Sequence, residues 1–365
     1  MDFFKLAKPQ IREIRPYQPG KLFEGRGDVL KLASNENLLG ISQQIRDAII
    51  AELDYVHYYP DDDALRVRTA LADKYGCSPD NLIMGNGAVQ IIYYLAEAFL
   101  LPGDEMIMAW PGFSIFDIYA QAQGATRIRV PVDLNFKADL GKILSEVTDR
   151  TKLICIDNPN NPCGTYVSER ELRDFLSKLP PRVLVLLDEA YYDFTDAPDY
   201  PEATLIWREF PNVVVARTFA KVYALAGLRA GVGIGHEGMM QVLWRVKGPF
   251  NLNRLAGAAL LAALGDEEFY KTTTENVKRM RKYIDAKLTE AGIFHPPSQA
   301  NFFLLDSGVD GKKLNELMNE DGVYLRPMAG FGLPTYFRAS FPPTEEQAER
   351  FIETLVRNIG SVRGF

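Results

Sequence analysis

The chain has 365 residues, of which 47% are hydrophobic and 24% charged, and its net charge is −7. This acidic balance argues against a nucleic-acid or anionic-membrane partner, because no basic surplus is present to neutralise phosphates. The longest apolar stretch, residues 91–101, is interrupted by Glu97 and is too short to span a bilayer. Three widely spaced cysteines without a CxxC pair, and a start without a secretory signal, favour a soluble cytoplasmic protein.

The first forty residues are rich in proline and glycine, and we expect residues 1–40 to form an extended N-terminal arm. Over residues 41–251, short apolar runs alternate with helical patterns, as is typical of buried parallel strands in an α/β sheet. The expected strands cover residues 82–84, 105–108, 152–156, 183–187 and 213–215. The expected helices begin near Ala88, Phe113, Ser168 and Asn253. These features predict a large domain with a mostly parallel central sheet flanked by helices.

The pattern changes over residues 252–365, where we expect a smaller α+β domain that also packs against the N-terminal arm. A long polar helix is expected over residues 267–291. It is followed by a strand at 301–305, a helix from 311, a Gly/Pro-rich loop at 327–334, a strand at 336–340 and a terminal helix. The three histidines lack metal-ligand spacing, so we assign no metal site.

Lys221 follows the apolar run 213–216 and stands eight residues before Arg229. Asp188 and Asn161 likewise stand just past apolar runs, so all three are expected at the carboxyl edge of the sheet, where ligands gather. An amine for an imine, a carboxylate for a pyridine nitrogen and a cation for a phosphate are what pyridoxal phosphate chemistry requires. The sequence therefore predicts a pyridoxal phosphate site built around Lys221.

Each neighbouring candidate has a plainer interpretation. Asp188 is also a common helix N-cap residue, and Asn161 lies in an Asn/Pro turn of ordinary type. In the cofactor interpretation, Asp188 keeps the pyridine nitrogen protonated, while Asn161 and Tyr191 hydrogen-bond the phenolate oxygen. Phe113 is a candidate for stacking on the pyridine ring, although an aromatic residue near a turn more often belongs to the core.

A glycine turn at residues 85–87 joins an expected strand to an apolar helix that opens with Ala88 and Val89. Free N–H groups and the helix dipole at such a helix start attract phosphate. Thr218 and Arg229 are further phosphate donors. Together these residues predict the phosphate end of the cofactor site.

Taken in order, these residues resemble the histidinol-phosphate aminotransferase family, which consists of fold-type-I enzymes of the aspartate aminotransferase superfamily. The resemblance covers nearly the whole chain. Further matching segments are residues 15–20, 32–37, 58–61, 158–164, 188–191, 325–327 and 337–338. The resemblance implies a homodimer in which Lys221, Asp188 and Tyr191 are catalytic. It implies that the N-terminal arm packs on the small domain and on the partner subunit.

The resemblance also assigns the remaining contacts. It implies cofactor contacts from Ala88, Val89, Phe113, Asn161, Thr218 and Arg229, with Tyr59 contributed by the partner subunit. Arg326 and Arg338 would hold the substrate's anionic end, and Tyr17 and Asn35 would line its pocket. The implied reaction transfers an amino group from a small-molecule amino donor, histidinol phosphate, to a 2-oxo acid, 2-oxoglutarate.

Several positions depart from the family pattern and leave the substrate open. Ala220 replaces a usual Ser, Val89-Gln90 a polar or acidic pair, Cys163 a usual Thr, Leu38 a common Pro, and residues 341–343 a Val-Gly-Thr-like segment. An aromatic amino acid aminotransferase and a threonine-phosphate decarboxylase share this machinery and remain alternatives. A pyridoxal phosphate-binding regulator is disfavoured, because no basic helix-turn-helix segment is visible.

Overall fold

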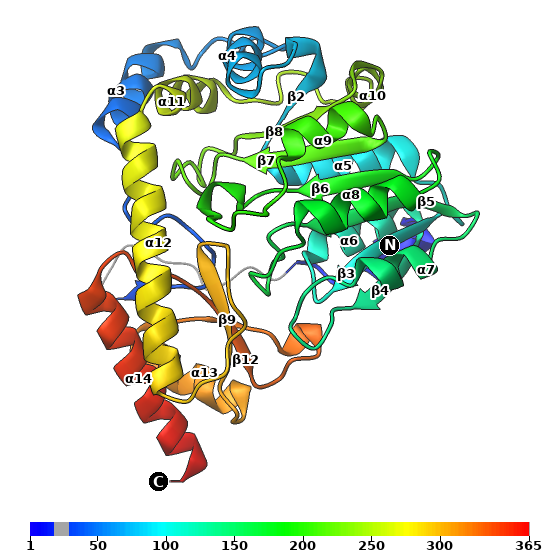
Figure 1. The fold of residues 1–365 in the computed structure, drawn as a ribbon. Coiled ribbons are helices and arrows are strands. Elements are labelled where there is room, and N and C mark those ends of the chain that lie inside the picture. The colour runs from blue at the N-terminus through cyan, green and yellow to red at the C-terminus, as the bar shows by residue number, and fades with distance from the viewer. Residues whose placement is uncertain (18–28, 365) are drawn as a thin grey trace.

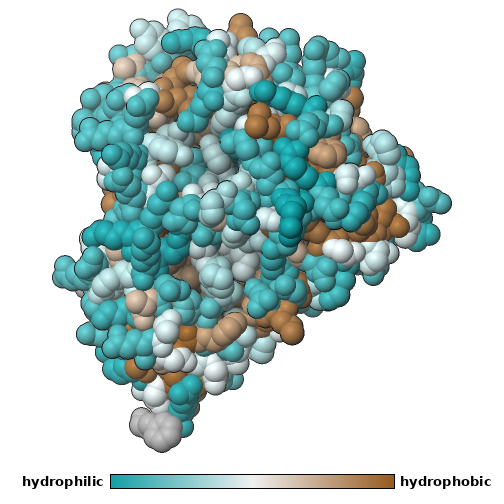
Figure 2. Space-filling model, viewed as in Figure 1, coloured by the Kyte–Doolittle hydropathy of each residue, from teal (hydrophilic) through white to brown (hydrophobic). Residues whose placement is uncertain are grey.

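The computed structural model describes residues 1–17 and 29–364, so the part of the expected N-terminal arm at residues 18–28 lies outside it. Figure 1 shows a larger α/β unit above a smaller unit, with helix α12 (Glu267–Glu290) running along both. Hydrophilic residues cover most of the same face in space-filling form, with hydrophobic ones in small separate groups (Figure 2). No helix within the described ranges has the length and apolar character needed to cross a membrane.

The large domain is built on a seven-stranded sheet in the order β2-β8-β7-β6-β5-β3-β4. Its strands are β2 (Leu82–Gly85), β3 (Glu105–Trp110), β4 (Thr126–Pro131), β5 (Thr151–Asp157), β6 (Leu184–Asp188), β7 (Val213–Thr218) and β8 (Gly231–Gly235). Strand β8 is antiparallel to both of its neighbours, and the other pairs are parallel. The fold class predicted from the sequence, an α/β protein with a mostly parallel sheet, is confirmed.

Helices cover both faces of this sheet (Figure 1). One face packs against α5 (Ala88–Phe99), α6 (Ser114–Gln123) and α10 (Glu237–Leu243). The other packs against α7 (Leu140–Ser145), α8 (Glu169–Lys178), α9 (Ala203–Glu209), α4 (Leu65–Tyr75) and α11 (Arg254–Leu264). The expected helix starts at Ser168 and Asn253 are N-caps, whose side chains accept backbone N–H groups of the first turn.

The expected strands are present, but β4 and β8 were not predicted. Strand β4 is an exposed edge strand, so it lacks the continuous apolar run of a buried strand. In β8, glycines alternate, and a Cβ on Gly231 would lie 2.3 Å from the Ala88 amide nitrogen. A Cβ on Gly233 would lie 2.9 Å from Ile91. The glycines therefore let α5 pack directly on the strand, although they weaken its strand pattern.

The small domain holds the antiparallel sheet β11-β12-β9, made of β11 (Arg326–Pro327), β12 (Tyr336–Ser340) and β9 (Phe302–Asp306). Helices α12, α13 (Gly311–Glu320) and α14 (Glu345–Arg363) share its core. Strand β1 (Leu30–Lys31) pairs in parallel with β10 (Val323–Tyr324), and Leu30 and Leu32 are buried in the same core. This part of the N-terminal segment is thus tied to the small domain, whereas α1 (Phe3–Leu6) and α2 (Pro9–Arg12) have no buried residues.

The packing differs from the expected domain boundary at residue 252. Helix α11 lies against α3 (Gln43–Glu52), and its buried side chains, Ala256 and Leu260 among them, belong to the large-domain core. The small-domain core begins further along, with Met280 in the second half of α12. An apolar helix such as α11 carries no local signal for the core it joins, so the change of sequence pattern near residue 252 could not place it.

Candidate active site

A cavity of about 220 Å³ lies at the carboxyl ends of β5, β6 and β7, where the small domain faces the sheet. The expected site residues other than Tyr59 all line it: Tyr17, Asn35, Ala88, Val89, Phe113, Asn161, Asp188, Tyr191, Thr218, Lys221, Arg229, Arg326 and Arg338. These residues come from distant parts of the chain. The parallel strands bring their carboxyl ends to one edge, which is the reason that the sequence reasoning placed the site there.

Lys221 lies just past β7, and its Nζ donates a hydrogen bond to the backbone oxygen of Ser34 at 3.3 Å. The pKa of this amine is lowered to about 8, mainly by burial and in smaller part by the nearby guanidinium groups of Arg338 and Arg229. Glu36 and Asp188 act in the opposite direction. The amine can therefore lose its proton near neutral pH and act as a nucleophile or a base.

Asp188 is the last residue of β6 and is buried in the cavity wall. The pKa of its carboxyl group is raised to about 7, mainly by burial and in smaller part by the neighbouring carboxyl group of Asp157. Its Oδ1 accepts the Ala190 N–H at 3.0 Å, as in the cap-like alternative. Such a buried carboxyl group becomes stable as an anion when a cation is placed beside it.

Tyr191 presents a hydroxyl group that two amides approach. Asn35 Nδ2 donates to it at 3.0 Å and Asn161 Nδ2 at 3.3 Å, so both oxygen lone pairs are engaged. Burial raises the pKa of Tyr191 to about 12, which keeps the hydroxyl protonated. Its own hydrogen remains as a donor toward an acceptor in the cavity.

Two arginines face the cavity from the small domain. Arg326 and Arg338 are opposite each other in the β11–β12 ladder. Arg338 donates from Nη1 to Asn161 Oδ1 at 2.6 Å and from Nη2 to the Ala33 oxygen at 2.8 Å, and burial lowers its pKa. Arg326 lies 5.8 Å from the ring centre of Tyr17. Within residues 1–17 and 29–364 neither guanidinium takes part in a salt bridge, so both can take an anion as a partner.

The opposite end of the cavity is shaped for a phosphate. The amides of Ala88 and Val89 open helix α5, where the helix dipole is positive. Gly87 has φ 79°, and a Cβ there would lie 2.5 Å from Nη2 of Arg229. The glycine thus leaves room for this guanidinium beside the helix start. Thr218, at the end of β7, is buried in the same wall.

Tyr59 lies apart from the cavity of its own chain. It is 78% exposed and stacks on Phe250 with the ring centres 4.6 Å apart. Phe113, in contrast, lies in the cavity wall, and its ring packs edge-on against Phe116. The structure therefore brings together every expected site residue except the one that the family resemblance assigns to a partner subunit.

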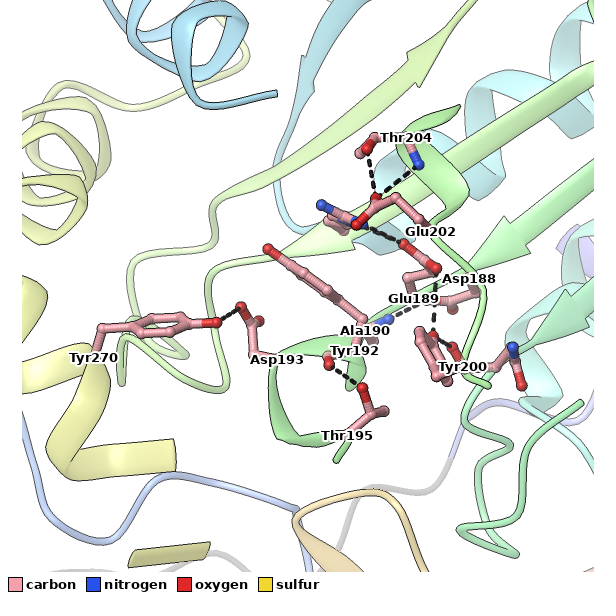
Figure 3. A network of polar contacts seen from close by, with 12 residues as sticks. Asp188, Glu189, Ala190, Tyr192, Asp193, Thr195, Tyr200, Glu202, Thr204 and Tyr270 are labelled. Carbon is pink, nitrogen blue, oxygen red and sulfur yellow. Dashed lines mark hydrogen bonds and ion pairs between the residues drawn. The ribbon is translucent and has the colours of Figure 1, made fainter. Parts of the chain in front are cut away.

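Sequence reasoning missed two features of the site. Asp157, at the end of β5, lines the cavity next to Asp188, and a carboxylate at the mouth of an apolar strand was the available signal. Glu189, the residue after Asp188, forms a buried ion pair in which Arg217 Nη2 donates to Glu189 Oε2 at 2.7 Å. Figure 3 shows Glu189 in its network of polar contacts. In the described part of the chain, no group of His, Cys, Asp and Glu is arranged to hold a metal ion.

Comparison with known proteins agrees with this geometry. The family model described as aminotransferase class I and II matches residues 27–355. A histidinol-phosphate aminotransferase of Geobacillus sp. (strain WCH70) is 37% identical over 96% of this chain and 97% of its own length. The histidinol-phosphate aminotransferase of Moorella thermoacetica is 40% identical over 96% of this chain and 92% of its own length. The chain belongs to the histidinol-phosphate aminotransferase family.

A solved member of this family has the same fold. The histidinol-phosphate aminotransferase of Sinorhizobium meliloti, in complex with pyridoxal-5'-phosphate, superposes with a TM-score of 0.88 at 26% identity, covering 97% of this chain and 98% of its own. The chain is therefore a pyridoxal phosphate-dependent aminotransferase. The fold-type-I architecture, the enzyme class and the cofactor expected from the sequence are confirmed.

The cavity of this aminotransferase fits that cofactor. It contains an amine with a lowered pKa, a buried carboxyl group that a pyridinium would stabilise, and a tyrosine hydroxyl with a free hydrogen. The departures noted in the sequence leave this set intact. Gln90 is held outside the phosphate end, where its Oε1 accepts the Asn86 N–H at 2.6 Å, and Cys163 is buried against Met328.

Proposed function

We propose that this aminotransferase converts histidinol phosphate and 2-oxoglutarate to imidazole-acetol phosphate and glutamate, in the cytoplasm. The main support for these substrates is the pair Arg326 and Arg338. The two arginines lie opposite each other on neighbouring strands, and both face the cavity. A planar guanidinium binds phosphate and carboxylate alike through two parallel N–H bonds. Two of them support a reaction in which one substrate ends in a phosphate and the other in a carboxylate.

Bound pyridoxal phosphate supplies an aldehyde that joins the substrate amine and a protonated ring that withdraws electrons from the substrate α-carbon. In this proposal Lys221 holds the cofactor, and its Nζ then moves the proton that leaves the α-carbon. A pKa of about 8 supports both duties, because part of the amine is neutral at neutral pH.

Asp188 is proposed to hold the proton of the pyridine nitrogen, since a carboxylate buried in this wall needs a cationic partner. Tyr191 and Asn161 are proposed to bind the phenolate oxygen through the hydroxyl hydrogen and the amide. Phe113 is proposed to lie against the ring face. The connection from Asn161 to Arg338 supports a site in which the cofactor end and the substrate end are aligned by one chain of hydrogen bonds.

The cofactor phosphate is proposed to rest on the Ala88 and Val89 amides, with Thr218 and Arg229 completing the cup. The helix start and the close approach of Arg229 to Gly87 support this assignment. Tyr17 and Asn35 are proposed to line the substrate side, beside Arg326 and Tyr191.

The active unit is proposed to be a homodimer in which Tyr59 reaches the phosphate cup of the partner subunit. The segment that carries Tyr59 contains further exposed apolar side chains, namely Leu53, Tyr55, Val56, Tyr58 and Leu65, and Tyr59 itself stacks on the exposed Phe250. Exposed large apolar side chains concentrated in one segment support an interface with another protein surface. The position of Tyr59 away from the cavity of its own chain supports a contribution to the site of the partner subunit.

The test compares substrates on one preparation. We expect kcat/KM for histidinol phosphate with 2-oxoglutarate to exceed that for phenylalanine by a factor of about ten or more, since a phosphate offers three acceptor oxygens to the two guanidinium groups and the carboxylate of phenylalanine only two. Release of carbon dioxide from phosphothreonine should stay at background. Equal rates on phenylalanine, or decarboxylation of phosphothreonine, would replace this proposal by the corresponding alternative.

A further inference from the structure

Asp157 is a second carboxyl group in the wall of the cavity. It ends β5, is 5% exposed, and lies directly beside Asp188 in the register of the parallel strands. Burial raises its pKa as it does that of Asp188. None of the roles proposed above uses it, yet a buried carboxyl group next to another is costly and needs compensating bonds.

The compensation comes from two loops. Asp157 Oδ2 accepts the backbone N–H of Phe113 at 3.1 Å and that of Asn161 at 2.8 Å. Its Oδ1 accepts Asn160 Nδ2 at 2.9 Å, and the same Nδ2 also donates to the Pro111 oxygen at 3.2 Å. One carboxylate thus ties the loop after β3 to the loop after β5.

These are the two loops that carry the proposed ring contacts. Phe113 comes from the first and Asn161 from the second, and both residues line the cavity. A carboxylate is the one side-chain group of this size that accepts at both oxygens and donates at neither. An amide in its place would turn an NH₂ group toward a donor in either orientation.

We propose that Asp157 is a positioning residue that sets the orientation of the bound cofactor by holding the backbones of Phe113 and Asn161. The inference rests on the roles proposed for those two residues. It is independent of the substrate, because the contacts all lie at the cofactor end of the cavity.

The test uses Asp157→Asn in the full chain, with Asp193→Asn as the matched control. Asp193 is also a buried carboxyl group, but it accepts the Tyr270 hydroxyl at 3.0 Å and points away from Asp188 (Figure 3). An asparagine there keeps the bond. Two readouts without substrate are measured, namely the dissociation constant of pyridoxal phosphate from the apo-protein and the visible circular dichroism band of the loaded protein.

We expect Asp157→Asn to raise that dissociation constant about tenfold, as loss of one charge-assisted hydrogen bond does, and to reduce the visible band. Asp193→Asn should change neither. Unchanged values in a folded Asp157→Asn protein would overturn the inference. If that variant does not fold, Asn160→Ala removes one of the three donors and should shift both readouts in the same direction, and no shift there would overturn it equally. The two proposals can fail separately. If the dissociation constant and the circular dichroism band change as expected but the wild-type enzyme does not use histidinol phosphate, only the proposed function is refuted.

Discussion

Arg338 of the small domain and Asn161 of the large domain are joined by a hydrogen bond of 2.6 Å from Nη1 to Oδ1. Asn161 Nδ2 continues the connection to the hydroxyl of Tyr191 at 3.3 Å. The group proposed to bind substrate anions is therefore connected through one side chain to a group proposed to face the cofactor. Movement of the small domain relative to the sheet would disturb both at once.

The first prediction concerns Lys221. Borohydride treatment of the loaded enzyme should attach pyridoxal phosphate to the peptide that contains Lys221, and Lys221→Ala should bind the cofactor without turnover. The fraction of neutral amine rises about tenfold per pH unit below the pKa. Because that pKa is lowered to about 8, the rate of covalent loading of the apo-protein should rise with pH and level off above about 8. Label on another lysine, or a rate that still rises steeply at pH 10, would contradict the assignment.

The second prediction concerns Asp188. Asp188→Asn should reduce kcat far more than it weakens cofactor binding, because a neutral amide does not hold the pyridine nitrogen protonated. Loss of one charged hydrogen bond in a dry site costs roughly 2–4 kcal/mol, which corresponds to about two to three decades in rate. Single-turnover measurements with saturating cofactor separate the two effects. A variant with a near-normal rate would show that Asp188 serves only to cap the segment after β6.

The third prediction concerns the arginine pair. Arg338→Lys and Arg326→Lys keep the charge but lose the planar fork, so kcat/KM should fall about tenfold or more in both half-reactions. For Arg338→Lys we also expect weaker cofactor binding, since the bond to Asn161 is lost. Arg326→Lys has no such bond to lose and is the matched comparison. Unchanged kinetics in Arg338→Lys would make that arginine structural.

The fourth prediction concerns Tyr59. Tyr59→Phe should weaken cofactor binding about tenfold through loss of one phosphate hydrogen bond. Mixing Lys221→Ala chains with Tyr59→Phe chains should restore full cofactor affinity at one site per heterodimer, because that site combines the intact lysine of one chain with the intact tyrosine of the other. Sedimentation during the assay gives the oligomeric state. A monomer with full activity is the result that excludes this arrangement.

The fifth prediction concerns the buried ion pair of Arg217 and Glu189. Glu189→Gln removes the hydrogen-bonded carboxylate of Arg217, which is 4% exposed, and leaves only the longer contact to Glu202 Oε1 at 3.9 Å. Removing one partner of a buried pair costs about 3–5 kcal/mol of unfolding free energy. Asp174→Asn breaks the exposed pair with Lys178 and should cost about 0–1 kcal/mol. Urea unfolding of both variants measures the contrast, and equal losses would refute the claim.

Much of the site could be predicted because its signals are local. Asp188 and Lys221 follow apolar runs, and parallel strands place such positions at one edge whatever the rest of the chain does. The glycine turn before Ala88 indicated a phosphate site for the same reason. Asp157 satisfied the same criterion and was overlooked, since its partners are backbone N–H groups that leave no mark in the sequence.

The amino-acid sequence by itself determined the fold class, the cofactor and the candidate residues at strand ends and at the glycine turn, because apolar periodicity and the side-chain chemistry at strand ends depend on neighbours along the chain. Only the tertiary structure decided that Asn35 meets Tyr191, that Arg338 meets Asn161 and that α11 packs with the large domain. These contacts join residues more than a hundred positions apart, or select one of two cores for an apolar helix. Each local segment is compatible with several arrangements. Which of these contacts form therefore depends on the packing of the whole molecule.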